Sequence, residues 1–178
     1  MNVIRPQRLQ VGLVAVLSLG SNLGEREATL RQAVAEIAAL SGVTVTAASA
    51  LVETPALKPH GVDTDAPAYL NAVITVRTVL SPQQLLDATS AIEHRHGRVR
   101  EERWGDRTLD IDIISFGGFT LHTDTLTLPH PRAAERSFVL APWAMIEPDA
   151  TLPGLGRIDA LLAGLTDLVV PYDSEPLL

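Results

Sequence analysis

Two acidic residues follow a group of arginines in the stretch 97–113, which reads GRVREERWGDRTLDIDI. The arginines are Arg98, Arg100, Arg103 and Arg107. If the end of the stretch is a strand, Asp110 and Asp112 share one face, because side chains alternate between faces. The apolar residues beside them are Leu109, Ile111 and Ile113. Paired carboxylates suit Mg²⁺ and guanidinium groups bind phosphate, so the stretch predicts transfer from a nucleotide.

Each of these features also has a purely structural explanation. Paired acids on a strand often form a solvated face. The arginines could equally pair with Glu101, Glu102 and Asp106 on a surface loop, where ion pairs contribute little stability. Trp104 is harder to explain in this way, because an exposed tryptophan often closes on a ligand or a lid.

Three polar residues elsewhere are further candidates. His130 lies between two prolines, where it could donate to a phosphate or only cap a turn; the nearby Arg132 and Arg136 favour the phosphate. The amide of Asn71 could recognise the edge of a heterocycle, or it could be an ordinary paired amide in a sheet. Taken alone, Glu93 is predicted to be a surface charge.

Composition limits the classes of function. The 178 residues fit one domain. A net charge of −7 argues against broad nucleic-acid binding, so the locally basic loop favours a small anionic ligand. Lys58 is the only lysine, which leaves few candidates for a P-loop or Schiff-base lysine. The lack of cysteine excludes disulfides, zinc–thiolate sites and thiol nucleophiles.

The N-terminus resembles a signal peptide, because Arg5 and Arg8 precede an apolar run. No A-x-A cleavage site follows the run, so we favour a buried first strand over 13–19. We expect a loose extension over 1–11, one domain over 12–165 and a tail over 166–178. No segment is long enough to span a bilayer.

The elements that must position the candidate residues follow the order β-α-β-β-α-β. The predicted strands are 13–19, 43–53, 69–78 and one carrying Asp110 and Asp112. One predicted helix runs from an Asn22–Glu25 capping box to Ser41, and the other from a Ser81–Gln84 capping box to about Gly97. This order is typical of an α+β, ferredoxin-like antiparallel sheet with the helices on one face. The alternation places Tyr69, Asn71, Asp110 and Asp112 on the face away from the helices.

The remaining segments are predicted to be loops, a hairpin and short helices. The polar stretch 56–67 is a candidate lid. Gly117 and Gly118 should turn the chain into a hairpin with 126–128. Short helical turns interrupted by Pro142 are expected over 132–146, and a short helix over 157–165.

Several motifs together carry a resemblance to one enzyme family. They are LSLGSNLGERE at 17–27, TPA at 54–56, YLNAV at 69–73, IEHRHGRVREERWGDRTLDIDII at 92–114, LPHPR at 128–132 and RSFVLAPW at 136–143. The family that they resemble is 6-hydroxymethyl-7,8-dihydropterin pyrophosphokinase of folate biosynthesis. The resemblance covers about residues 13–150, and its RWGxRTLDxDI string is highly specific. It implies the same ferredoxin-like fold.

The resemblance implies transfer of the pyrophosphoryl group of ATP, the co-substrate, to the hydroxymethyl group of the pterin, with release of AMP. It implies two Mg²⁺ ions held by Asp110 and Asp112, and catalytic roles for these two residues and for Arg98 and Arg107. The implied ATP-binding residues are Glu93, Arg98, Arg100, Arg103, Trp104, Arg107, Ile113, His130 and Arg136. The implied substrate-binding residues are Thr54, Pro55, Ala56, Tyr69, Asn71, Trp104, Asp110 and Phe138, with the pterin between Tyr69 and Phe138. Arg100, Arg103 and Trp104 would belong to a loop that closes over the site.

The resemblance has departures, and two other functions stay open. Ala56 replaces a usual second proline, Ser90 replaces a longer polar residue, and the arginine loop is one residue shorter than in some relatives, which affects the alignment of Arg100. A metal-dependent nucleotidyltransferase would normally have a third carboxylate. A ligand-sensing module would not need the arginine loop. We expect a cytoplasmic monomer that binds small molecules and neither nucleic acid nor membranes.

Overall fold

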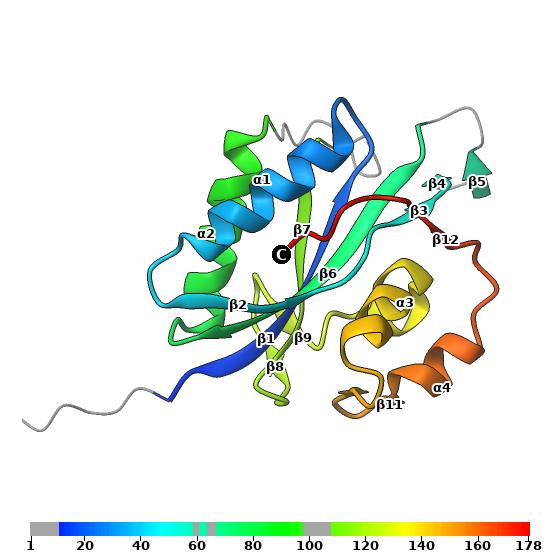
Figure 1. Cartoon of the computed structure of the whole chain (residues 1–178). Coiled ribbons are helices and arrows are strands. Elements are labelled where there is room, and N and C mark those ends of the chain that lie inside the picture. The colour runs from blue at the N-terminus through cyan, green and yellow to red at the C-terminus, as the bar shows by residue number, and fades with distance from the viewer. Residues whose placement is uncertain (1–10, 59–60, 64–66, 98–107) are drawn as a thin grey trace, which may run out of the picture.

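An antiparallel sheet forms the centre of the computed structural model, which describes residues 11–58, 61–63, 67–97 and 108–178 (Figure 1). The strands are β1 (Leu13–Ser21), β2 (Val43–Ala48), β3 (Val52–Thr54), β4 (Ala56–Lys58), β5 (Gly61–Asp63), β6 (Tyr69–Thr78), β7 (Asp110–Phe116), β8 (Leu121–His122), β9 (Thr127–Leu128), β10 (Thr151–Leu152), β11 (Gly156–Arg157) and β12 (Val170–Pro171). The helices are α1 (Arg26–Ala38), α2 (Pro82–Arg95), the 3₁₀ turn η1 (Ala133–Glu135), α3 (Ser137–Ile146) and α4 (Ile158–Ala163).

The order of the strands confirms the ferredoxin-like prediction. The main sheet runs β12–β3–β6–β1–β7, and β2 also pairs with β6. Every pair in it is antiparallel. Since β2 and β3 both pair with β6, they share the place of the second strand of the βαββαβ motif.

The sheet carries a different hydrophobic core on each face. Helices α1 and α2 cover one face, where Leu30, Ile92 and Ile74 are buried together. On the other face, Trp143 and Ile158 from α3 and α4 pack against Val73 (Figure 1). Within the described ranges, no helix has both the length and the apolar composition needed to cross a bilayer.

The predicted alternation along β7 is confirmed at its start. Leu109, Ile111 and Ile113 are buried in the core under α1 and α2. Asp110 and Asp112 are half-buried residues of the same strand and alternate with them. Their side chains therefore lie on the face away from α1 and α2.

Two predicted connections differ in the structure. The strand expected over 43–53 is divided, because Ser49 leaves the ladder and its Oγ accepts a hydrogen bond from Val73 N at 3.0 Å. The stretch 56–67, expected as a loop, includes the paired strands β4 and β5. Residues 59–60 and 64–66 of this candidate lid lie outside the described residues.

One helix start was predicted correctly and the other was not. At α2, Gln84 N donates to Ser81 Oγ at 3.2 Å and Ser81 N donates to Gln84 Oε1 at 2.8 Å, which confirms the capping box. Helix α1 begins only at Arg26, and no side-chain hydrogen bond caps it. Asn22, the predicted cap, instead donates from Nδ2 to Pro67 O at 3.4 Å.

In the C-terminal third, the structure differs from three predictions. Gly117 and Gly118 do turn the chain, with φ of 61° and 74°, but the partner of β9 is β8 rather than β7. Helix α3 continues through Pro142. The expected tail contributes β12, which pairs with β3 at the edge of the sheet.

An ion-pair group joins the two helices of the first face. Glu36 on α1 accepts a hydrogen bond from Arg95 Nη2 at 2.7 Å. Its Oε1 also lies 2.9 Å from Nε2 of His96, at the end of α2. The hydrogen bond from Arg95 is the main cause of a pKa of Glu36 below its ordinary 4.5, and His96 adds to it. A carboxyl whose pKa is lower in the folded state stabilises the fold above its unfolded pKa, and this contribution is lost as the pH falls through the folded pKa.

We therefore expect Glu36→Gln to weaken the acid dependence of stability. Between about pH 5 and pH 3 the free energy of unfolding should fall less steeply in the variant than in the original chain. Urea unfolding at a series of pH values measures the two slopes. Equal slopes in this window would contradict the assignment.

Candidate active site

A row of three residues crosses the sheet at the centre of the candidate site. Gly20 on β1 is in register with Asn71 on β6 and with Asp110 on β7. A Cβ atom at position 20 would lie 3.0 Å from Asn71 Oδ1 and 3.8 Å from Tyr69 Cδ1. The missing side chain therefore lets the Asn71 amide lie close against the backbone of β1, in the same row as Asp110. The strand predicted over 13–19 stops before Gly20, whereas β1 continues to Ser21.

The amide of Asn71 is held in one orientation. Asn71 is buried, and its Nδ2 donates to Thr54 Oγ1 at 3.0 Å. The oxygen Oδ1 is consequently the atom that faces Gly20. Tyr69, half-buried, stands two residues earlier on the same face of β6. These residues form a polar and aromatic surface against which a flat heterocycle could pack.

Asp112 connects β7 to the start of α3. Its Oδ2 accepts a hydrogen bond from Arg136 Nη1 at 3.0 Å and lies 3.8 Å from His130 Nε2. The guanidinium carbon of Arg136 lies 5.6 Å from the centre of the Phe138 ring, within cation–π range. The site thus gathers an acid, two nitrogen donors and an aromatic ring.

The imidazole of His130 has a defined proton position. Arg132 N donates to Nδ1 at 3.2 Å, so Nδ1 is an acceptor and the neutral ring carries its proton on Nε2. Burial lowers the pKa of His130 below its ordinary value, and Arg136 acts in the same direction, whereas Asp112 raises this pKa. The Nε2–H group points towards Asp112 and is available for hydrogen bonding to an anion.

Glu93 is buried, so the prediction of a surface charge from the residues alone was wrong. Its Oε1 accepts a hydrogen bond from Ile111 N at 2.7 Å. Ile111 lies between the two aspartates of β7. Glu93 therefore joins the end of α2 to the outer edge of the strand that presents both carboxylates.

Removing the Glu93 carboxylate should destabilise the fold. In Glu93→Leu the buried Ile111 N–H loses this acceptor, which should lower the free energy of unfolding by about 1–3 kcal/mol. Glu93→Gln keeps an oxygen acceptor and should lose less. Urea unfolding measures both, and a leucine variant as stable as the original chain would contradict the role of this hydrogen bond.

The two aspartates suit a magnesium ion. Mg²⁺ is usually bound by one or two carboxylates together with substrate phosphates. Asp110 and Asp112 provide two carboxylates on the face that also carries Asn71 and Arg136. Within the described part of the chain, no group of three His, Asp or Glu side chains could hold a metal without such help.

The remaining predicted site residues are those of the arginine loop, together with Pro55, Ala56 and Ile113. Arg98, Arg100, Arg103, Trp104 and Arg107 lie outside the described residues. Pro55 is half-buried after Thr54, and Ala56 begins β4. Ile113 is buried in the core under α1 and α2, so an ATP contact at this residue would have to use its backbone.

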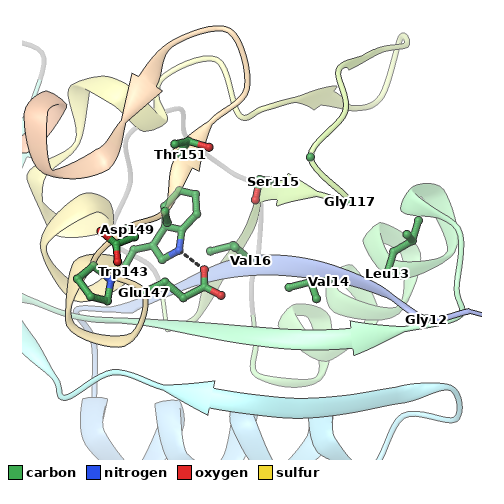
Figure 2. A pocket seen from close by; sticks show the side chains of 13 residues that line it. Gly12, Leu13, Val14, Val16, Ser115, Gly117, Trp143, Glu147, Asp149 and Thr151 are labelled. Atoms are coloured by element: carbon green, nitrogen blue, oxygen red, sulfur yellow. Dashed lines mark hydrogen bonds between the residues drawn. The ribbon is translucent and has the colours of Figure 1, made fainter.

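A hollow lies at the end of α3 that is farther from Arg136 (Figure 2). It has a volume of about 700 Å³ and is bounded by the start of β1, the turn at Gly117 and the loop after α3. Trp143 Nε1 donates to Glu147 Oε2 at 2.8 Å in its wall. None of the predicted site residues lines it.

Residues 16–148 match the family model of 7,8-dihydro-6-hydroxymethylpterin-pyrophosphokinase (HPPK). Similar proteins named 2-amino-4-hydroxy-6-hydroxymethyldihydropteridine pyrophosphokinase occur in Bacillus subtilis and Methylorubrum extorquens. The first is 47% identical over 133 residues, covering 75% of this chain and 77% of the relative. The second is 45% identical over 140 residues, covering 79% of this chain and 86% of the relative.

A crystal structure of Plasmodium falciparum HPPK-DHPS with pterin and p-hydroxybenzoate has a similar fold, with a TM-score of 0.66 at 16% identity. The likeness covers 85% of this chain and 43% of that longer one, and at this identity it concerns the fold alone. The family match and the two bacterial relatives carry the assignment. The chain belongs to the 7,8-dihydro-6-hydroxymethylpterin-pyrophosphokinase family and is an ATP-dependent pyrophosphokinase.

Proposed function

We propose that the chain transfers the pyrophosphoryl group of ATP to 6-hydroxymethyl-7,8-dihydropterin, in folate synthesis. The hydroxymethyl oxygen forms a bond to the β-phosphorus, the bond between the α,β-bridging oxygen and the β-phosphorus breaks, AMP leaves, and the hydroxyl proton is released. The observation that carries the proposal is the row of Asn71, Gly20 and Asp110 beside the group of Asp112, Arg136 and His130. We propose that the flat ring binds at the row and that the phosphates bind beside it, at the group around Asp112.

The pterin half of the site uses β6 and α3. The Asn71 amide, fixed by Thr54, offers an oxygen towards the space at Gly20, where ring N–H groups could donate. We propose that Tyr69 and Phe138, both half-buried, stack on the two faces of the ring. Ring orientation then places the hydroxymethyl group near the β7 carboxylates.

The phosphate half of the site uses β7 and the segment before α3. Arg136 Nη1 and His130 Nε2 converge on Asp112 Oδ2, so an ATP phosphate beside Asp112 would be within reach of both donors. We propose that Asp110 and Asp112 hold two Mg²⁺ ions, which when bound neutralise charge on the phosphate oxygens. Positioning and charge neutralisation are what phosphoryl-type transfer requires, so a strong general base is not needed.

The roles that we propose for the arginine loop rest on the family resemblance alone. We propose that Arg98 and Arg107 bind ATP phosphates and that Arg100, Arg103 and Trp104 close over the site, excluding water.

The proposed place of action is the cytoplasm, because ATP is the co-substrate, and the proposed form is a monomer. A nucleotidyltransferase is less well supported, because the described residues contain no cluster of three metal-binding acids.

The test is an analysis of nucleotide products by chromatography. Purified protein is mixed with Mg²⁺, ATP and 6-hydroxymethyl-7,8-dihydropterin, with a second sample lacking the pterin. AMP that appears only with the pterin, in step with a pyrophosphorylated pterin, is the expected result. ADP, or AMP formed without the pterin, would contradict the proposal.

A further inference from the structure

Arg26, the first residue of α1, bridges two strands of the sheet. Its Nη1 donates to Glu53 Oε1 at 2.8 Å and to Ala68 O at 2.6 Å. Glu53 lies on β3, and Ala68 immediately precedes β6. One nitrogen therefore fixes a side chain of one strand and the backbone at the start of the other.

The two contacts flank residues of the pterin half of the site. Glu53 immediately precedes Thr54 and Ala68 immediately precedes Tyr69, and Thr54 and Tyr69 are partners in the β3–β6 ladder. Strand β3 has only three residues, so its end has few ladder hydrogen bonds of its own. Arg26 thus holds together the two chain ends between which residues 55–67 run.

Arg26 acts from the side of the sheet that carries α1. Thr54 and Asn71 hydrogen-bond to each other on the opposite face, where Asn71 borders Gly20. The guanidinium is therefore placed to position substrate-binding residues without touching a ligand. The side chains of Arg26 and Glu53 are 24% and 36% exposed, and ion pairs with such exposure contribute little to global stability.

We propose that Arg26, through Glu53 and Ala68, is a positioning residue that sets Thr54, Tyr69 and Asn71 for binding the pterin. This inference rests on the proposed function. A small displacement of positioning groups is costly for a rigid ligand, because binding depends on geometry that is already in place. Loss of the bridge should therefore weaken pterin binding more than it changes the chemical step or ATP binding.

The test compares Arg26→Met with Arg26→Lys and with Arg31→Met. Arg31 is a matched control, because it lies on the same helix and bonds to Glu27 and to the carbonyl of Pro176 instead of to β3 or β6. Pterin affinity is measured by calorimetric titration with Mg²⁺ and a non-hydrolysable ATP analogue, and kcat and the two KM values are measured separately.

We expect Arg26→Met to weaken pterin affinity about tenfold, with kcat and the KM for ATP changed by less than about twofold. Arg26→Lys should restore most of the affinity, because one ammonium nitrogen can donate to both acceptors. Arg31→Met should change none of these values. Unchanged pterin affinity in Arg26→Met, or an equal loss in Arg31→Met, would overturn the proposal.

Hydrogen exchange gives a second readout that needs no turnover. The amides of residues 54, 69 and 70 should exchange faster in Arg26→Met than in Arg31→Met, because the paired ends of β3 and β6 lose their bridge. Faster exchange with unchanged pterin affinity would show a structural brace only and would also overturn the proposal. If the original chain forms no pterin-dependent AMP, the proposed function fails, whereas the affinity and exchange comparisons still decide the role of Arg26.

Discussion

Replacing Asp112 by alanine should lower turnover by about 1,000-fold or more, which corresponds to roughly 4 kcal/mol in the activation barrier. Asp112 is the residue on which Arg136 and His130 converge, and it is one of the two proposed magnesium ligands. Its removal would take away a metal ligand and the anchor of a phosphate-binding arginine together. The measurement is the steady-state rate of AMP formation at saturating ATP and pterin.

The fold should survive this substitution. The Asp112 side chain is 32% exposed, and ion pairs at such positions are worth about 0–1 kcal/mol. Asp149→Asn is a suitable control, because Asp149 is also paired with an arginine, Arg157, but lies outside the site. Turnover near the original rate in a folded Asp112→Ala variant would refute the metal assignment.

The sequence predicted the elements whose signals are local. The face that Leu70, Ala72, Ile74 and Val76 share on β6 and the capping box of α2 each depend on residues within one element, and both are present. The pairing of Asp110 with Asp112 on one face follows from the same two-residue period. The order of the elements then favoured one sheet topology.

Other features depend on contacts between distant residues. Ile114 is an extra residue in β7, since Val16 pairs with Ser115 and Leu17 with Ile113. The alternation therefore shifts after Ile113, and Phe116 rather than Ser115 joins the core that holds Ile113. The local sequence IDII gives no sign of such a bulge. Pro142 was expected to interrupt α3, but it is buried within the helix, and tertiary packing can offset the lost hydrogen bond.

In the candidate site too, residues with a local signal were predicted, and those that depend on contacts between distant residues were not. The aspartates, His130 and Arg136 were predicted from their types, and the structure brings Asp112, His130 and Arg136 together. The buried acceptor Glu93 was misjudged from its residue type, because its partner, Ile111 N, lies on another element. Gly20 was missed as a site residue, since its importance comes from its register with two other strands.

Filling the space at Gly20 should weaken pterin binding strongly. In Gly20→Val the Cβ alone would lie 3.0 Å from Asn71 Oδ1, and the two methyl groups would project between the amide and Asp110. We expect the pterin affinity to fall by about 30-fold or more, since overpacking costs roughly 1–3 kcal/mol. Calorimetric titration with Mg²⁺ and a non-hydrolysable ATP analogue measures this affinity.

The affinity for the ATP analogue provides the control within the same variant. It should change by less than about twofold, because the proposed phosphate ligands lie around Asp112, beyond the Gly20 row. Valine suits a strand, and the thermal midpoint of the variant shows whether the sheet is retained. Gly20→Ala should have a smaller effect, because a single methyl group requires Asn71 to move only slightly. A folded valine variant with undiminished pterin affinity would mean that the ring does not lie between Asn71 and Asp110, and the pterin would have to be placed elsewhere on this face.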